Sequence, residues 1–300
     1  MLPRIYHPRN YVLATTAEEV CYILSTEGEK SRIVAGNVTL NELSKRGLLS
    51  SVETLVDISL LGLDYVKLEN NALRIGSMTS IASLTDSEPI SGSLAFRSIR
   101  QAVTQVLPLQ VRNAGTVGGS ICTGLPFLDL PIALMVVDSD VRLLGKEGFH
   151  TVSLAEFHKG ILSSTTPQFL IEVVVPYDGT NQITRITGFQ KFGVTGLDEA
   201  ILNIAASVTF HEAFQIQNAR LLAGGRGMDI VELTEASQFL ADERLSLEAS
   251  VKAGDIAADV LDPPTDLRGT SKFKKRIAKV LVQRVLEDIL NTARKEKMKS

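Results

Sequence analysis

Two short segments rich in glycine and hydroxyl residues contain the residue types best suited to chemistry in this chain. The first reads Ala-Gly-Asn-Val-Thr over residues 35–39, directly after an apolar run, and the second reads Thr-Val-Gly-Gly-Ser over residues 116–120. Glycine lets consecutive backbone N–H groups converge on an anion, and the hydroxyls of Thr39, Thr116 and Ser120 can add donors. This is the chemistry of a diphosphate cradle.

Neither segment matches a standard nucleotide fingerprint. The Gly-x-Gly-x-x-Gly pattern of the Rossmann fold is absent from both, and so is the phosphate loop Gly-x-x-x-x-Gly-Lys-Ser/Thr. A Rossmann-type nucleotide fold is therefore disfavoured. A single glycine pair after a strand is more often a plain turn, so the binding interpretation depends on the presence of both segments.

The elements before and around the first segment alternate between helix and strand. A helix is expected over 17–25, because a capping box precedes apolar residues at helical spacing. A short strand over 33–35 then enters a tight turn at Gly36 and Asn37. Another strand is expected at 55–58.

A hairpin is predicted shortly after these elements. Apolar residues alternate over 66–68 and 73–75 on either side of Asn70 and Asn71. Adjacent asparagines tolerate the positive φ of a two-residue turn. Helical periodicity follows over 94–106.

The later part of the chain has longer strands and then helices. Proline, glycine and asparagine over 176–181 mark a boundary. Strands are expected at 141–144, 169–175, 183–192, 201–210 and 215–223. Helices are expected at 231–240, 247–260 and 272–294. A sheet with helices over one face is the natural α+β arrangement for this order.

Length and composition narrow the class of protein. The chain has 300 residues, of which 44% are hydrophobic and 22% charged, enough for two domains with real cores. Lysine and arginine total 31 against 34 acidic residues, giving a net charge of -3. This balance does not predict a nucleic-acid surface.

The number and spacing of the cysteines and histidines do not predict a metal site in this chain. Cys21 and Cys122 are too few for a disulfide framework or a four-cysteine zinc or iron–sulfur site, and a reducing compartment fits best. The four histidines have no metal-ligand spacing, so no metal is expected.

We expect a cytoplasmic protein without an integral membrane segment. The longest nearly apolar run, residues 130–137, is well short of the roughly 20 residues that a membrane helix needs. Residues 1–10 are rich in proline and arginine and lack the apolar core of an export signal.

Three stretches carry a resemblance to a known family. Ile-Val-Ala-Gly-Asn-Val-Thr-Leu at 33–40, Val-Arg-Asn-Ala-Gly-Thr-Val-Gly-Gly-Ser-Ile at 111–121 and Asp-Leu-Pro at 129–131 resemble the FAD-binding medium subunit of molybdenum hydroxylases. That family includes carbon monoxide, xanthine and nicotinate dehydrogenases. Lys191 with Asp198, and the segment 263–270, also resemble its C-terminal domain, so the resemblance covers nearly the whole chain.

The resemblance implies an α+β fold in two parts. Residues 1–177 would form a two-lobed FAD-binding domain of the type found in molybdopterin dehydrogenases, with lobes at about 1–57 and 58–177 and FAD extended between them. Residues 183–300 would form an α+β C-terminal domain with a sheet covered by helices.

The resemblance also implies a set of cofactor contacts and no catalytic residue in this chain. The implied FAD-binding residues are Ala35, Gly36, Asn37, Val38, Thr39, Leu40, Thr116, Val117, Gly118, Gly119, Ser120, Thr123, Asp129, Leu170 and Lys191. The two glycine segments would wrap the diphosphate with backbone donors. Thr123 and Asp129 would contact the cofactor through a hydroxyl and a carboxylate. Leu170 would pack near the isoalloxazine ring, and Lys191 would favour the reduced flavin through its positive charge.

Some residues depart from the pattern or have simpler explanations. Val38 stands where many members have a hydroxyl, which puts one cofactor contact in doubt and leaves open whether the isolated chain retains FAD. Taken alone, Asp129 could cap a helix, and Lys191 could be a solvated strand residue.

The function implied by the resemblance is electron transfer by the FAD-binding subunit of a molybdenum-dependent dehydrogenase. A small iron–sulfur subunit and a large molybdenum-cofactor subunit would be its partners, as a dimer of heterotrimers. The alternatives are a self-contained flavin oxidoreductase and a flavin-free assembly subunit.

Overall fold

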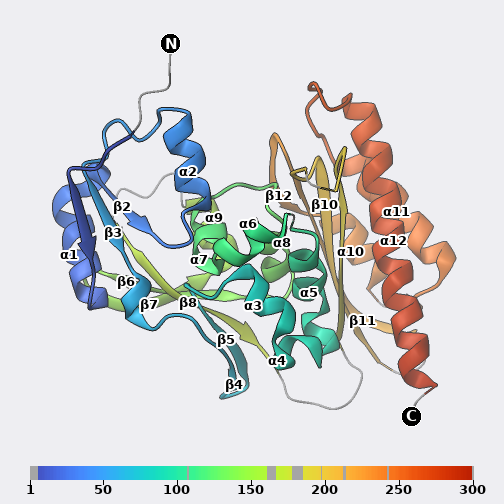
Figure 1. Cartoon of the computed structure of the whole chain (residues 1–300). Helices are drawn as coiled ribbons and strands as arrows, with labels where there is room; N and C mark the ends of the chain where they lie inside the picture. Colours follow the sequence, from blue (N-terminus) through green and yellow to red (C-terminus); the bar gives the residue numbers. More distant parts are fainter. Residues whose placement is uncertain are drawn as a thin grey trace. The chain divides into compact units, whose positions relative to one another are not determined.

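The computed structural model divides the chain into two compact units, each assembled from separate segments. It describes residues 6–106, 108–160, 167–177, 185–196, 198–211, 214–241 and 243–298. Unit 1 comprises Met1–Leu84, Leu109–Gly124 and Ser139–Pro176. Unit 2 comprises Thr85–Pro108, Leu125–Asp138 and Tyr177–Ser300. Most of the helices and strands are labelled in Figure 1.

Unit 1 begins with a parallel three-stranded sheet in the order β1-β3-β2. Its strands are β1 (Asn10–Leu13), β2 (Ser31–Val34) and β3 (Thr54–Asp57). The crossover helices are α1 (Ala17–Glu27) and α2 (Val38–Lys45), with the 3-10 turns η1 (Gly28–Lys30) and η2 (Ser59–Leu61). The predicted first helix is confirmed: Oγ1 of Thr16 accepts from N of Glu19 at 3.1 Å and caps α1.

The second sheet of unit 1 is antiparallel, with five strands in the order β4-β5-β8-β6-β7. They are β4 (Val66–Glu69), β5 (Ala72–Gly76), β6 (Asp140–Gly145), β7 (Gly148–Ser153) and β8 (Phe169–Pro176). The predicted hairpin is β4–β5. Asn70 and Asn71 have φ values of 51° and 56°, which confirms the two-residue turn.

The core of unit 1 joins its two sheets. Val20 of α1 and Val56 of β3 belong to the same buried cluster as Leu144 of β6 and Phe169 of β8. In addition, Sγ of Cys21 lies 3.2 Å from the carbonyl oxygen of Leu144. The sheets that the sequence assigned to two lobes therefore share one apolar core.

Short helices complete unit 1. They are α6 (Leu109–Ala114), α7 (Val117–Cys122) and α9 (Leu154–Gly160). The chain passes from unit 1 to unit 2 within α3 (Ile81–Asp86). None of the helices in the described part of the chain is long and apolar enough to cross a membrane.

Unit 2 contains an antiparallel four-stranded sheet in the order β12-β11-β10-β9. Its strands are β9 (Arg185–Phe192), β10 (Leu202–Phe210), β11 (Ile216–Gly225) and β12 (Met228–Glu232). Its helices are α4 (Glu88–Ser91), α5 (Arg97–Thr104), α8 (Asp129–Met135), α10 (Thr234–Leu240), α11 (Leu247–Val260) and α12 (Ser271–Lys297), with the 3-10 turn η3 (Leu94–Phe96).

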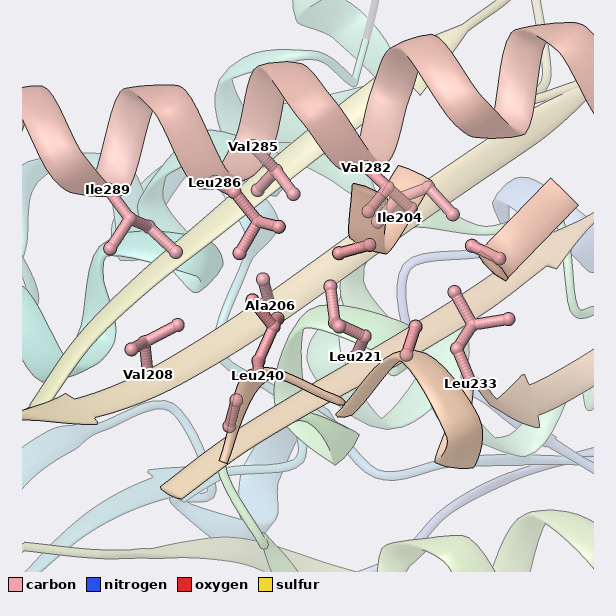
Figure 2. Close-up of a cluster of buried hydrophobic side chains, with 14 of the residues drawn as sticks. Ile204, Ala206, Val208, Leu221, Leu233, Leu240, Val282, Val285, Leu286 and Ile289 are labelled. Carbon is pink, nitrogen blue, oxygen red and sulfur yellow. The ribbon is translucent and has the colours of Figure 1, made fainter. Parts of the chain in front are cut away.

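One face of this sheet is covered by the C-terminal helix. Alternate side chains of β10 point toward α12, as Figure 2 shows, and they share a single buried cluster with α10 and α11. The labelled members are Ile204, Ala206, Val208, Leu221, Leu233, Leu240, Val282, Val285, Leu286 and Ile289. Strand alternation puts Asn203, Ala205 and Ser207 on the opposite face. The α+β fold class predicted from the sequence is confirmed.

The prediction of a helix over 231–240 is wrong in its first part. Strand β12 extends to Glu232, and the helix begins at Thr234. Gly227, with a φ of 81°, lies in the turn that returns the chain from β11 to β12. Strands β1 and β7 are additions that the sequence did not predict.

The expected boundary lies partly outside the described residues. Residues 178–184 are not described, and these include most of the predicted linker and the first two residues of the predicted strand 183–192. Two segments that precede this boundary, Thr85–Pro108 and Leu125–Asp138, group with the C-terminal unit. The division at 177–183 stays a prediction.

Candidate cofactor-binding site

The first glycine segment leads into the N-terminus of helix α2. Asn37 occupies the N-cap position with a φ of 58° and makes no side-chain capping hydrogen bond. The first backbone N–H groups of a helix have no acceptor within the helix, and the helix dipole favours an anion beside them. Val38, Thr39 and Leu40 form this first turn. The segment therefore has the donor chemistry of a phosphate site.

Gly36 brings the first segment into contact with the chain just before the second. A Cβ added at Gly36 would lie 1.7 Å from the carbonyl oxygen of Ala114 and 3.2 Å from Cα of Gly115. Only a residue without a side chain can fill this position. The structure thus brings the two segments of unit 1 together, as a shared cradle requires.

The second segment is the N-terminus of α7, and its backbone donors are already bonded. N of Val117 donates to the carbonyl of Thr79 at 2.9 Å, and N of Gly118 donates to the carbonyl of Ser77 at 2.8 Å. Gly119 N donates to Oγ1 of Thr116 at 3.1 Å, and Ser120 N donates to the Thr116 carbonyl at 2.9 Å. This segment accordingly offers a close-packed glycine surface and hydroxyls, while the first segment offers backbone donors.

The two adjacent glycines of α7 have different surroundings. A Cβ at Gly118 would lie 2.8 Å from Cβ of Ser77, so this glycine packs inward. A Cβ at Gly119 would meet Oγ1 of Thr116 at 3.0 Å and, among the described residues, no other atom outside the backbone of its own helix within 4 Å. Gly119 is therefore the glycine beside which a ligand has room.

Gly119→Val is expected to reduce FAD retention while the fold survives. The added side chain would occupy the open side of α7 and hinder approach of the diphosphate, with little steric conflict inside the protein beyond Thr116. The measurement is the flavin-to-protein ratio of the purified variant, with circular dichroism to monitor folding. Full flavin content in a folded Gly119→Val protein would remove this segment from the site.

Two further candidates, Thr123 and Leu170, also belong to unit 1. Thr123 follows α7, and its hydroxyl donates to the carbonyl of Ser120 at 3.0 Å. Leu170 is buried on β8 and pairs with Leu143 of β6. The register shifts beside this pair, which leaves a bulge in the sheet.

The last two candidates, Asp129 and Lys191, form a buried ion pair in unit 2. Asp129 is the first residue of α8, and Nζ of Lys191 on β9 lies 2.8 Å from its Oδ2. The side chains are 4% and 10% exposed, respectively. Leu128 occupies the N-cap position of α8, so Asp129 is not the capping residue. Neither simpler explanation, a helix cap or a solvated lysine, describes these residues.

Burial dominates the charge state of this carboxyl group. Desolvation raises the pKa of Asp129 above its ordinary value, while the ammonium of Lys191 and the amide of Asn203 act in the lowering direction. The folded protein therefore holds this proton to higher pH than the unfolded chain does.

The stability contribution of Asp129 is expected to fall as pH rises. From the ordinary value of 3.8 up to the raised pKa, the folded state binds more protons than the unfolded state, so the free energy of unfolding decreases across this window. Urea unfolding at a series of pH values, with wild type compared to Asp129→Asn, measures the effect. Asp262→Asn, at a 93% exposed carboxylate, is the control. A wild-type-minus-variant difference that is flat over the window would contradict the assignment.

Sequence reasoning missed several residues that shape these sites. The carbonyls of Ser77 and Thr79 hold the backbone of α7, and Asn203 lies beside Asp129. The available signal for Asn203 was an amide near the start of a mostly apolar strand. No comparable signal marks Ser77 or Thr79, because they act through their backbone.

The described residues contain no group of three or more histidine, cysteine, aspartate or glutamate side chains placed to hold a metal ion. The candidate residues of unit 1 are backbone donors, hydroxyls and close-packed glycines, and those of unit 2 are a buried ion pair.

Comparison with protein families shows which family the chain matches. Residues 6–178 match the family described as the FAD binding domain in molybdopterin dehydrogenase. The chain belongs to this family. Residues 188–289 match the CO dehydrogenase flavoprotein C-terminal domain. The resemblance seen in the sequence is thereby confirmed: the chain is an FAD-binding flavoprotein subunit of the molybdopterin dehydrogenases, which are oxidoreductases.

Individual members of the family are similar over nearly the full chain. The 6-hydroxypseudooxynicotine dehydrogenase complex subunit alpha of Paenarthrobacter nicotinovorans is 30% identical over 96% of this chain and 96% of its own length. The carbon monoxide dehydrogenase medium chain of Afipia carboxidovorans is 26% identical over 88% of this chain and 91% of its own. A solved carbon monoxide dehydrogenase chain from Hydrogenophaga pseudoflava has the same fold, with a TM-score of 0.86, 24% identity and coverage of 97% and 99%.

The residues present fit the FAD of this family. The uncapped N-terminus of α2 supplies donors for a diphosphate, and Gly36 allows the close approach of the segment before α7. The carboxylate of Asp129 is a suitable acceptor for sugar or ribityl hydroxyls. In the family, the molybdenum cofactor and iron–sulfur clusters belong to partner subunits.

Proposed function

We propose that this chain is an electron-transfer subunit, which receives electrons from the iron–sulfur clusters of a partner and passes them from FAD to an acceptor. The observation that carries the proposal is the uncapped start of α2 beside the glycine contact to Ala114, within a domain of the FAD-binding family. Bound FAD would supply the redox chemistry, accepting and releasing electrons at its ring.

Each proposed contact follows from the chemistry of the residue concerned. The first turn of α2, with Ala35, Gly36 and Asn37 before it, would hold the diphosphate through backbone N–H groups. Residues 116–120 and Thr123 would provide a close surface and hydroxyls. Leu170 would exclude water beside the ring.

Asp129 and Lys191 would act as a pair. The carboxylate would accept hydrogen bonds from the cofactor while it remains paired to the ammonium. Lys191 would stabilise negative charge that develops on the reduced ring, and its effect would be moderated by the carboxylate 2.8 Å away.

The partners of the proposal follow from the relatives. One relative is named as a subunit of a dehydrogenase complex and another as a medium chain. By analogy, we propose a small iron–sulfur subunit and a large molybdenum-cofactor subunit as partners, arranged as a dimer of heterotrimers. We also propose that 1–177, with lobes at about 1–57 and 58–177, is the FAD-binding domain and 183–300 the C-terminal domain.

The structure weakens the argument for a flavin-free assembly subunit. That alternative depended on the hydroxyl missing at Val38. Val38 lies in the first turn of α2, where the donor to an anion is the backbone N–H, which every residue except proline possesses. The substitution therefore leaves the diphosphate chemistry of this turn intact.

The test compares the chain alone with the chain in its complex. We expect the isolated chain to bind FAD weakly, because partner contacts complete the pocket, and to gain FAD on mixing with the partners. Flavin content by visible absorbance and chain identity by mass spectrometry are the measurements. Failure of the assembled complex to hold FAD would refute the proposal. Tight, full occupancy of the isolated chain would refute the need for partner contacts, and activity without any partner would favour a self-contained oxidoreductase.

A further inference from the structure

Asn203 is a polar residue at the centre of the four-stranded sheet of unit 2. It lies on β10, and its side chain is fully buried. Strand register places it opposite Lys191 on β9 and opposite Gly224 on β11. Directly opposed residues of antiparallel strands project to the same face, so these three positions form one row across the sheet. The row lies on the face opposite α12.

The amide of Asn203 faces the carboxylate that pairs with Lys191. Nδ2 of Asn203 lies 3.5 Å from Oδ1 of Asp129, while Nζ of Lys191 lies 2.8 Å from Oδ2. The two oxygens of Asp129 are thus held by different side chains from neighbouring strands. Turning the amide over would place its oxygen against the carboxylate, which is repulsive, so the amino group must face Asp129.

Gly224 provides the space for this orientation. A Cβ at Gly224 would lie 2.8 Å from Oδ1 of Asn203 and 2.8 Å from the carbonyl oxygen of Pro126. Oδ1 of Asn203 has no hydrogen-bond partner among the described residues. A buried polar atom without a partner costs free energy and calls for an explanation. The amide is therefore not placed to satisfy its own hydrogen bonds.

We propose that Asn203 is a positioning residue for the flavin site: its amide fixes the Asp129 carboxylate, and through that carboxylate it directs the ammonium of Lys191. This inference rests on the proposed function, in which Asp129 and Lys191 contact FAD. Gly224 supports the same role by leaving room for the amide oxygen.

The key variant is Asn203→Leu, which keeps a similar volume and removes the amide. Ser207→Ala is the matched control, since Ser207 is buried on the same strand and face but bonds to Arg185 instead, with 2.9 Å between Oγ and Nε. Asn203→Ser is a milder variant that retains a donor and is expected to give an intermediate effect.

The first measurement needs no cofactor. The full chain is labelled with ¹³C-aspartate, and the Asp129 carboxyl signal, assigned by its loss in Asp129→Asn, is titrated. Asn203→Leu is expected to raise this pKa by roughly half to one pH unit, the value of one hydrogen bond to the carboxylate. Ser207→Ala is expected to leave it unchanged.

The second measurement uses the assembled complex. Asn203→Leu is expected to retain FAD but to change its midpoint potential in the same direction as Lys191→Met does, whereas Ser207→Ala leaves the potential unchanged. A folded Asn203→Leu protein with the wild-type Asp129 titration and the wild-type potential would overturn the proposal. If the wild-type complex holds no FAD, the proposed function fails, and the carboxyl titration still decides whether Asn203 positions Asp129.

Discussion

Gly36→Ala is expected to abolish FAD retention and to lower the free energy of unfolding by about 3 kcal/mol, the upper end of the usual cost of overpacking. The added Cβ would lie 1.7 Å from the carbonyl oxygen of Ala114. This oxygen belongs to the backbone, so no side-chain rotation can relieve the clash. Relief of this clash must separate the start of α2 from the segment before α7. The measurements are the flavin-to-protein ratio and a urea unfolding curve.

Gly160→Ala is the matched control for this experiment. Among the described residues, a Cβ at Gly160 would meet no atom outside its own helix within 4 Å, so the same chemical change is made without a clash there. We expect this variant to retain FAD and wild-type stability. Gly36→Ala protein with full flavin content would show that the contact between the two segments is irrelevant to the cofactor.

Lys191→Met is expected to lower the midpoint potential of bound FAD by roughly 30 mV, equivalent to about 1.4 kcal/mol for a two-electron couple. Methionine keeps much of the apolar stem but removes the positive charge that favours the reduced ring. The variant also leaves Asp129 buried without its cation, and loss of one member of a buried pair costs about 3 kcal/mol or more of stability. A redox titration of the complex and a urea unfolding curve measure the two effects.

The double variant Asp129→Asn with Lys191→Met separates charge from packing. It removes both charges, so its potential and stability are expected to return most of the way to wild type. A Lys191→Met protein with bound FAD and an unchanged potential would show that Lys191 does not act on the flavin. A double variant that is less stable than Lys191→Met would show that the pair contributes by packing instead of charge.

Local sequence signals predicted the elements whose conformation depends on neighbouring residues. Thr16 and Glu19 marked the start of α1, and the positive φ of Asn70 and Asn71 follows from the tolerance of asparagine for that geometry. The first glycine segment was placed correctly after its strand, although the helix that begins at Val38 was not recognised. Its apolar spacing is short, and a left-handed N-cap at Asn37 is uncommon for a helix start.

Contacts between residues that are far apart in the chain could not be predicted from local sequence patterns. Asp129 and Lys191 were chosen individually by resemblance, but their ion pair joins positions 62 residues apart and depends on how α8 packs against the sheet of unit 2. The bonded state of the α7 backbone depends on Ser77 and Thr79, which come from another part of the chain. The last two residues of strand β12, Val231 and Glu232, were predicted as helix because the hairpin turn at Gly227 was not recognised.

The most direct test of the account is to capture the complex through this chain and to measure flavin, iron and molybdenum in the chains that come with it. We expect FAD at one equivalent per copy of this chain, lost in Gly36→Ala and kept in Gly160→Ala, with iron and molybdenum carried by the partner chains. A captured complex that holds iron and molybdenum but no flavin, or whose flavin is unaffected by Gly36→Ala, would contradict it.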